Sequence, residues 1–157
     1  MHLLSIIIFY LLCISQSINA QEQTTIDSLE RLLMNTKIPY EKAELYYQLS
    51  KQHYLQLDFD HAEEYTRLAL RHYSKNNHKG IGGCYNILAG IYGQTFRNQT
   101  ALNYVDSALY SYELIPDSVG IVLALSNKGG IHMHLEQFKE GAESLYRCLE
   151  ISEKIGH

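Results

Sequence analysis

The sequence predicts an all-α protein, a right-handed α-solenoid of antiparallel helix pairs with about seven helices after residue 20. Two kinds of observation carry this prediction. Small residues recur at steps of 39 and 40 residues, in two series: Ala62, Ala101 and Gly141, then Ala69, Ala108 and Cys148. A leucine follows each member of the second series. Self-similarity at a fixed period of this length indicates tandem helical units that bury a shared core between neighbours.

Residues 1–20 are predicted to be a secretory signal peptide. They contain no Asp, Glu, Lys or Arg, and an apolar run from Leu3 to Ile14 precedes a short polar stretch that ends at Ala20. A membrane anchor at the N-terminus is the less favoured alternative, because about twelve apolar residues fall short of the roughly 20 that span a bilayer. We therefore expect a secreted or periplasmic chain with no membrane span after cleavage.

The composition after residue 20 excludes some partners. The chain carries 13 Lys and Arg against 17 Asp and Glu, a net charge of −4 at pH 7. Without a basic stripe to displace counterions from phosphates, nucleic acid is not an expected ligand. Cys84 and Cys148 lie in different repeats, so we interpret both as small buried apolar residues rather than a disulfide framework.

Residues 21–38 are expected to form an N-terminal capping helix that matches no repeat. Its apolar face is marked by Ile26, Leu29, Leu32 and Leu33, and Thr24 and Thr25 are candidates for its N-cap. Pro39 suits the first turn of the next helix, where its missing N–H is not needed. This segment would cover the apolar side of the first helix pair.

Residues 39–157 divide into three units, at about 40–79, 80–117 and 118–157. The expected helix pairs are 40–57 with 59–75, 81–95 with 99–114, and 118–135 with 138–155, and Asp58 and Asn98 are predicted N-caps. Short links make the two helices of each unit antiparallel neighbours. Glycines within these helices indicate either close packing between helices or room for a ligand backbone: Gly90, Gly93, Gly129 and Gly130.

The pattern resembles the tetratricopeptide repeat (TPR) over residues 40–157. The second unit fits best, with Leu88-Ala89, Tyr92, Ala101 and Ala108-Leu109. The first has His53 in the tyrosine position, and the third has His132, Gly141 and Cys148-Leu149. At 39–40 residues the units exceed the usual length of about 34. Long repeats behind a signal peptide are similar to the extracytoplasmic TPR segment of bacterial two-component sensor histidine kinases and related regulators.

This resemblance implies a concave groove formed mainly by the first helix of each unit. The implied partner-binding positions are Tyr47, Lys51, Tyr54, Asn86, Gln94, Ser126, Met133 and His134, with Gly90 and Gly130 among them. An extended peptide or a helix would lie there through side-chain hydrogen bonds and ring contacts. The alternative is that these positions are merely solvated and a partner binds elsewhere. In some TPR domains, pairs of Lys and Asn side chains clamp a terminal carboxylate. The groove positions of this sequence do not have that arrangement.

No catalytic residue, metal site or cofactor is predicted. His132 and His134 are two residues apart on a helix and point about 200° from one another, so they cannot share an ion. His53 and His61 flank a helix break and can approach one another, but we expect nothing nearby to complete a ligand set. No nucleophile with an adjacent base and no glycine-rich phosphate loop occurs in the sequence, so an enzyme is not expected.

These observations leave three hypotheses for function. The first is a non-enzymatic scaffold that binds a protein or peptide outside the cytoplasm, or the sensory part of a signalling protein. The second is a structural module that associates with another subunit through an uncapped C-terminal face carrying Leu145, Leu149 and Ile155. The third is a truncated sensor kinase or regulator, because another unit would be expected to begin near His157. The sequence does not name the ligand.

Overall fold

The computed structural model describes residues 21–156, and they form an all-α fold without strands. Residues 21–35 are helical and precede six further helices: α2 (Pro39–Leu55), α3 (Phe59–His72), α4 (His78–Gln94), α5 (Asn98–Glu113), α6 (Ser118–His134) and α7 (Phe138–Lys154). The predicted all-α class of paired helices is therefore confirmed. The predicted signal peptide, residues 1–20, lies outside the described residues and stays a prediction.

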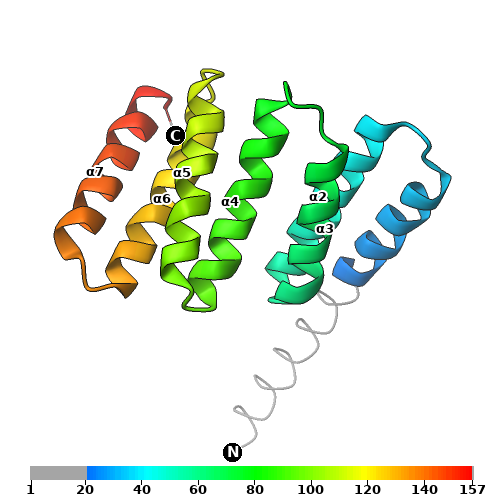
Figure 1. Cartoon of the computed structure of the whole chain (residues 1–157), viewed down its shortest axis with the longest axis horizontal. Helices are drawn as coiled ribbons and strands as arrows, with labels where there is room; N and C mark the ends of the chain where they lie inside the picture. The colour runs from blue at the N-terminus through cyan, green and yellow to red at the C-terminus, as the bar shows by residue number, and fades with distance from the viewer. Residues whose placement is uncertain (1–20, 157) are drawn as a thin grey trace, which may run out of the picture.

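The helices are arranged as three antiparallel pairs in a row, α2 with α3, α4 with α5, and α6 with α7 (Figure 1). Helix α4 contacts both α2 and α6, whereas within the described residues α3 makes no comparable contact with α5, nor α5 with α7. The first helices of the three pairs thus lie closer together than the second helices do. The array consequently curves with α2, α4 and α6 on its inner face.

Side chains at the helix starts satisfy backbone N–H groups that have no partner within the helix. Asp58, Asn77 and Asp117 accept hydrogen bonds from the N–H groups three residues later, at 3.3, 3.0 and 3.0 Å. The predicted cap at Asp58 is confirmed, and Pro39 lies in the first turn of α2, as expected.

Two predicted caps are wrong. The N-cap of α5 is Arg97, which makes no side-chain cap bond, and Asn98 is already the first helical residue. Its Oδ1 is buried without a hydrogen-bond partner. Thr24 and Thr25 lie inside the N-terminal helix, where both hydroxyls donate to the carbonyl oxygen of Gln21. In both cases the helix begins earlier than the side-chain pattern predicts.

The link inside each pair repeats the same backbone conformation. Leu57, Phe96 and Glu136 have positive φ values of 61°, 58° and 58°, at the same steps of 39 and 40 residues. The N–H of the following residue donates to a carbonyl oxygen five positions back in every link, at 2.9, 2.8 and 2.9 Å. This is the Schellman pattern of helix termination, in which glycine is the usual residue. The backbone therefore repeats where the side chains do not.

Replacing Glu136 with glycine is expected to raise the free energy of unfolding by about 1 kcal/mol. A residue with a Cβ pays on the order of 1–2 kcal/mol in the left-handed region, and glycine does not, although its greater freedom in the unfolded chain offsets part of the gain. Urea unfolding measures the change. The matched control is Glu143→Gly, in the exposed middle of α7, which should lower stability by about 1 kcal/mol; a loss in both variants would contradict the assignment.

The core lies between the helix pairs rather than in a separate layer. Its fully buried members include Leu49, Leu88 and Val105, and one continuous cluster extends from Ala62 in α3 to Ile131 in α6. The recurring small residues Ala62, Ala101 and Gly141 are all buried, as their close approach to the neighbouring helix requires. Cys84 is buried and Cys148 half-buried, and both are free thiols.

Candidate partner-binding face

Two cavities open on the inner face formed by α2, α4 and α6. The larger, about 540 Å³, lies toward the N-terminal ends of α4 and α6 and includes Tyr47. The smaller, about 200 Å³, lies nearer the opposite ends of these helices. Cavities of this kind, lined by a few convergent polar groups, are the usual places for a ligand to bind.

The small cavity brings together half of the predicted groove. Tyr54, Gln94, Ser126 and His134 line it from three successive first helices, together with Gly130. Residues from separate repeats thus converge because equivalent helices lie side by side. His134 is exposed.

The other four predicted positions lie elsewhere. Tyr47 lines the large cavity, and the Nζ of exposed Lys51 lies 5.8 Å from the centroid of its ring. Asn86 is half-buried, and its Oδ1 accepts a hydrogen bond of 2.9 Å from the Nδ2 of Asn127. Met133 points away from the groove, because its sulfur lies beside Gly141 at the seam between α6 and α7. The prediction that Met133 lines the groove is therefore wrong.

The sequence leaves open whether the glycines within helices serve close packing or leave room for a ligand. The structure shows that the role differs between positions. A Cβ at Gly90 would lie 2.6 Å from the hydroxyl oxygen of Tyr54, so this glycine serves close packing between α4 and α2. A Cβ at Gly129 would lie 2.6 Å from the Cγ of Leu145. At Gly130 a Cβ would meet nothing within 4 Å, so this position leaves open space in the small cavity.

Four tyrosines and two carboxylates line the large cavity. They are Tyr40, Tyr47, Tyr73, Tyr112, Glu44 and Asp117. The hydroxyl of Tyr73 donates to Glu44 Oε1 at 2.9 Å, and Asp117 Oδ1 caps α6. Burial, reinforced by Cys84, Glu44 and Asp117, raises the pKa of Tyr47 to about 12, and burial likewise raises the pKa of Tyr112. These hydroxyls stay protonated and available as donors at neutral pH.

Sequence reasoning missed this cavity, although a signal for it exists. Tyr73 and Tyr112 lie at the ends of second helices, whereas the TPR resemblance implies a groove formed mainly by first helices. Each lies across from a glycine in the first turn of the next first helix, since a Cβ at Gly80 or Gly120 would lie 2.5 or 2.4 Å from a ring carbon. Tyrosine followed by glycine seven or eight residues later, in two successive repeats, marks the arrangement.

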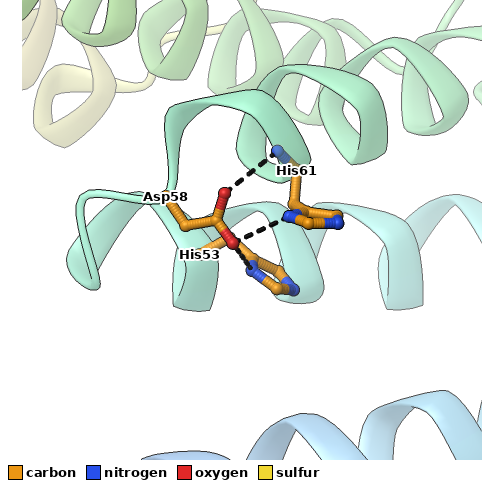
Figure 2. Close-up of side chains that lie close together, drawn as sticks. All are labelled: His53, Asp58 and His61. Carbon is orange, nitrogen blue, oxygen red and sulfur yellow. Dashed lines mark hydrogen bonds and ion pairs between the residues drawn. The ribbon is translucent and has the colours of Figure 1, made fainter.

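A His–Asp–His cluster lies at the link between α2 and α3 (Figure 2). Asp58 Oδ2 is 3.1 Å from the Nδ1 of His53 and 2.8 Å from the Nδ1 of His61. From the sequence, Asp58 is predicted only as an N-cap, but its carboxylate reaches both histidines and makes it a candidate third ligand. Burial acts to raise the pKa of Asp58, but the hydrogen bonds from His61 and His53 outweigh it and lower the pKa overall.

The contacts of this cluster are those of a helix cap. Both Nδ1 atoms converge on one carboxylate oxygen, while the other oxygen accepts from the N–H of His61. The Nε2 of His53 is buried without a partner, which suits an unprotonated nitrogen. A metal bound at Nδ1 would force the proton onto Nε2, where it would have no acceptor.

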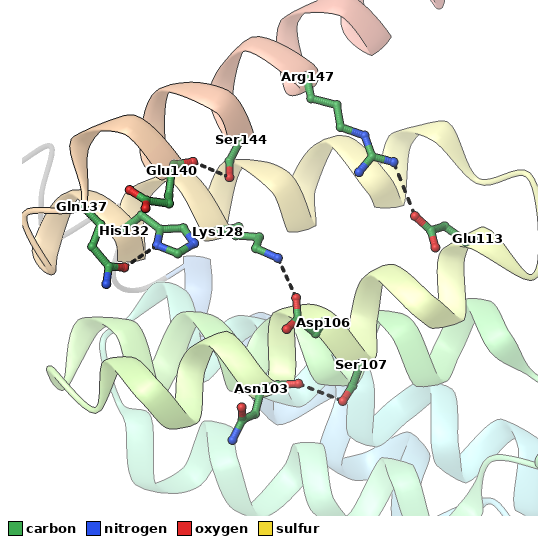
Figure 3. A network of polar contacts seen from close by, with 10 residues as sticks. All are labelled: Asn103, Asp106, Ser107, Glu113, Lys128, His132, Gln137, Glu140, Ser144 and Arg147. Atoms are coloured by element: carbon green, nitrogen blue, oxygen red, sulfur yellow. Dashed lines mark hydrogen bonds and ion pairs between the residues drawn. The ribbon is translucent and has the colours of Figure 1, made fainter.

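A contact between the same two positions of the repeat occurs in the other two links, with different chemistry. Tyr92 lies beneath the guanidinium of Arg97, with 4.3 Å from Cζ to the ring centroid. The half-buried His132 binds Gln137 Oε1 at 2.7 Å through Nδ1 (Figure 3). In each repeat a ring near the end of the first helix thus contacts the residue five positions later, so the pairing of His53 with Asp58 belongs to the architecture.

Replacing Asp58 with alanine is expected to lower the free energy of unfolding by about 1 kcal/mol at pH 7, the usual effect of losing an N-cap. Because folding lowers the pKa of Asp58 below its ordinary value of 3.8, the carboxylate's contribution is present above that pH and is lost as pH falls below it. Urea unfolding should therefore show a gap between wild type and variant that narrows below pH 4. The control is Asp60→Ala, an exposed acid in the same turn, which should change stability less; an equal loss in both would argue against the cap.

Separate polar contacts join α5 to α6 and α5 to α7 (Figure 3). Lys128 Nζ lies 2.7 Å from Asp106 Oδ1, and Arg147 lies 3.5 Å from Glu113. Asp106 and both members of the second pair are exposed. Surface pairs of this kind contribute about 0–1 kcal/mol each, so they help to fix the register of neighbouring helices and do not define a site.

Comparison with known proteins supports the fold and no more. No protein-family model matches the chain, and no curated protein matches it. It is similar to the crystal structure of BtubC (BKLC) from P. vanneervenii, with a TM-score of 0.66 and 20% sequence identity over 87% of this chain. The chain spans 56% of the length of that protein. Both therefore belong to the class of all-α proteins with a helical, repeat-like fold.

Among residues 21–156, no helix has the length and apolar character needed to cross a membrane.

Proposed function

We propose that this chain is a non-enzymatic binding module of the TPR type, which holds a segment of another polypeptide on the inner face of α2, α4 and α6. The observation that carries the proposal is the small cavity, where Tyr54, Gln94, Ser126 and His134 converge from three repeats around open space at Gly130. The TPR assignment is supported by the concordant sequence units and by the repeated links within the helix pairs.

The chemistry of this face suits a polypeptide ligand. The small cavity offers a phenol hydroxyl, an amide, a serine hydroxyl and an imidazole, which match the donors and acceptors of a peptide backbone. The large cavity lies on the same face and is wide enough for a side chain. A segment that lies along three first helices would meet both cavities, as peptides do in concave repeat surfaces.

A random peptide library, selected on the purified chain, tests this proposal. Selected peptides should bind at least tenfold more weakly to the Gly130→Leu variant, which fills the small cavity without striking another atom at its Cβ. The matched control is Asn103→Leu, which adds the same side chain at an exposed position of α5. Peptides that bind both variants as they bind the wild type would contradict binding at this face.

We also propose that the module works outside the cytoplasm, as the sensory part of a signalling protein or as a free scaffold. The support is the apolar segment of residues 1–20 in the sequence. Intact-mass measurement of the exported protein tests the location. A chain that begins at Gln21 is expected, and a chain that keeps residues 1–20 would contradict cleavage at Ala20.

A second candidate function is self-association through α7. Leu145, Leu149 and Ile155 are 43%, 54% and 38% exposed, so α7 presents an apolar stripe. Burying such a stripe against another copy would remove apolar surface from water. Sedimentation at micromolar concentration should then show a dimer that Leu149→Lys dissociates. A monodisperse monomer would count against this candidate.

A further inference from the structure

The large cavity combines aromatic faces with negative charge. Tyr40 and Tyr73 lie edge to face, with 6.5 Å between ring centroids, and Tyr47 and Tyr112 complete the aromatic lining. A ring face carries negative electrostatic potential, so several rings around one space attract a cation. The exposed Lys51 already illustrates the contact, because its ammonium lies 5.8 Å from the Tyr47 ring centroid.

Two carboxylates add to this potential. Glu44 is held by the Tyr73 hydroxyl at 2.9 Å, and Asp117 uses Oδ1 to cap α6. Lys79 also lines the cavity, but it is exposed. Within residues 21–156, neither Glu44 nor Asp117 forms an ion pair, whereas Glu63, Asp106, Glu113 and Glu143 each form one. In the lining, the two carboxylates therefore outnumber the one lysine.

We propose that the large cavity binds the basic side chain of a polypeptide ligand, with the ammonium or guanidinium group of a lysine or arginine between the tyrosine rings and the carboxylates of Glu44 and Asp117. This inference rests on the proposed function, because it assigns one residue type of the bound segment. The volume of about 540 Å³ admits such a side chain with its flanking backbone. An acidic side chain would meet two like charges, which disfavours its binding.

Titration of the isotope-labelled chain with blocked tripeptides, followed by NMR, tests the inference. The probes are Gly-Lys-Gly, Gly-Arg-Gly, and Gly-norleucine-Gly, which has the length of lysine without the charge. The two basic peptides should shift the amide signals of Gly80 and Gly120, which line the cavity, in a saturable manner. The norleucine peptide should bind at least tenfold more weakly.

The decisive variant is Glu44→Gln with Asp117→Asn. An amide oxygen at each position still accepts the hydrogen bonds from Tyr73 and Gly120, so the fold is retained while two charges are lost. Binding of the basic peptides should fall at least tenfold. The control with the same net charge is Asp60→Asn with Glu64→Gln, two exposed acids of α3, which should leave binding within about twofold because they are screened by water.

Equal binding of the lysine and norleucine peptides, or unchanged binding in the Glu44 and Asp117 variant, would overturn the inference. Its failure is separable from failure of the proposed function. If selected library peptides lose affinity in Gly130→Leu while basic tripeptides leave the large cavity unshifted, the groove binds polypeptide without a basic anchor. If basic tripeptides fill the cavity but library peptides ignore Gly130→Leu, the cavity is a cation site on a face that does not bind extended polypeptide.

Discussion

Replacing Leu88 with alanine is expected to lower the free energy of unfolding by about 2–5 kcal/mol, the range for a fully buried leucine. Leu88 has no exposed surface and lies in α4, at the centre of the main core cluster. Helix α4 contacts α2, α3, α5 and α6, so a cavity there weakens the packing of every pair. Urea unfolding monitored by circular dichroism measures the loss.

The matched control for Leu88 is Leu55→Ala at the end of α2. The Leu55 side chain is 67% exposed, so its truncation should change stability by no more than about 0.5 kcal/mol. Comparable losses in the two variants would mean that the core does not lie between the helix pairs. An unchanged stability in Leu88→Ala would contradict its burial directly.

Replacing Gly120 with alanine is expected to lower the free energy of unfolding by about 1–3 kcal/mol, as overpacking of a core does. The added Cβ would lie 2.4 Å from Cδ1 and Cε1 of Tyr112 and 2.7 Å from its Cγ. Because Cγ is the ring atom nearest the backbone and Tyr112 is 4% exposed, the ring cannot swing aside. This cost exceeds the gain in helix propensity, which is at most about 1 kcal/mol.

The matched control for Gly120 is Gly130→Ala in the same helix. A Cβ at Gly130 meets nothing within 4 Å, so only the propensity gain remains and stability should rise by up to about 1 kcal/mol. Thermal or urea unfolding should therefore show a loss of stability in Gly120→Ala and a gain in Gly130→Ala. The same sign in both variants would show that Tyr112 does not pack on Gly120, and hence that the large cavity is shaped differently.

Sequence reasoning predicted the architecture because spacing determines it. Small residues at steps of 39 and 40 positions require equivalent close approaches, and the structure has them at Ala62, Ala101 and Gly141. The left-handed links escaped prediction because Leu57, Phe96 and Glu136 occupy positions where glycine would be the signal. Side-chain patterns locate helices well. The ends of the helices depend on backbone conformations, and a left-handed residue that is not glycine leaves no signal in the sequence.

The candidate site was predicted in part for a related reason. The resemblance to the TPR implies that Tyr54, Gln94 and Ser126 lie on the inner face of successive first helices, and the small cavity brings them together. The same resemblance implies that Met133 lines the groove, but its sulfur packs beside Gly141 at the seam with α7. The large cavity depends on Tyr73 and Tyr112, which reach across from second helices. The implied groove includes first helices only, so these tyrosines were missed.

The most direct test of the central claim, that α2, α4 and α6 form the binding face, is an NMR map of the chain with a library-selected peptide. Amide signals of Gly90 and Gly130, which line the small cavity, should move together with others of these three helices. Signals from the exposed positions of α3, α5 and α7 should stay in place. Shifts confined to the outer helices, with Gly90 and Gly130 unchanged, would contradict the account.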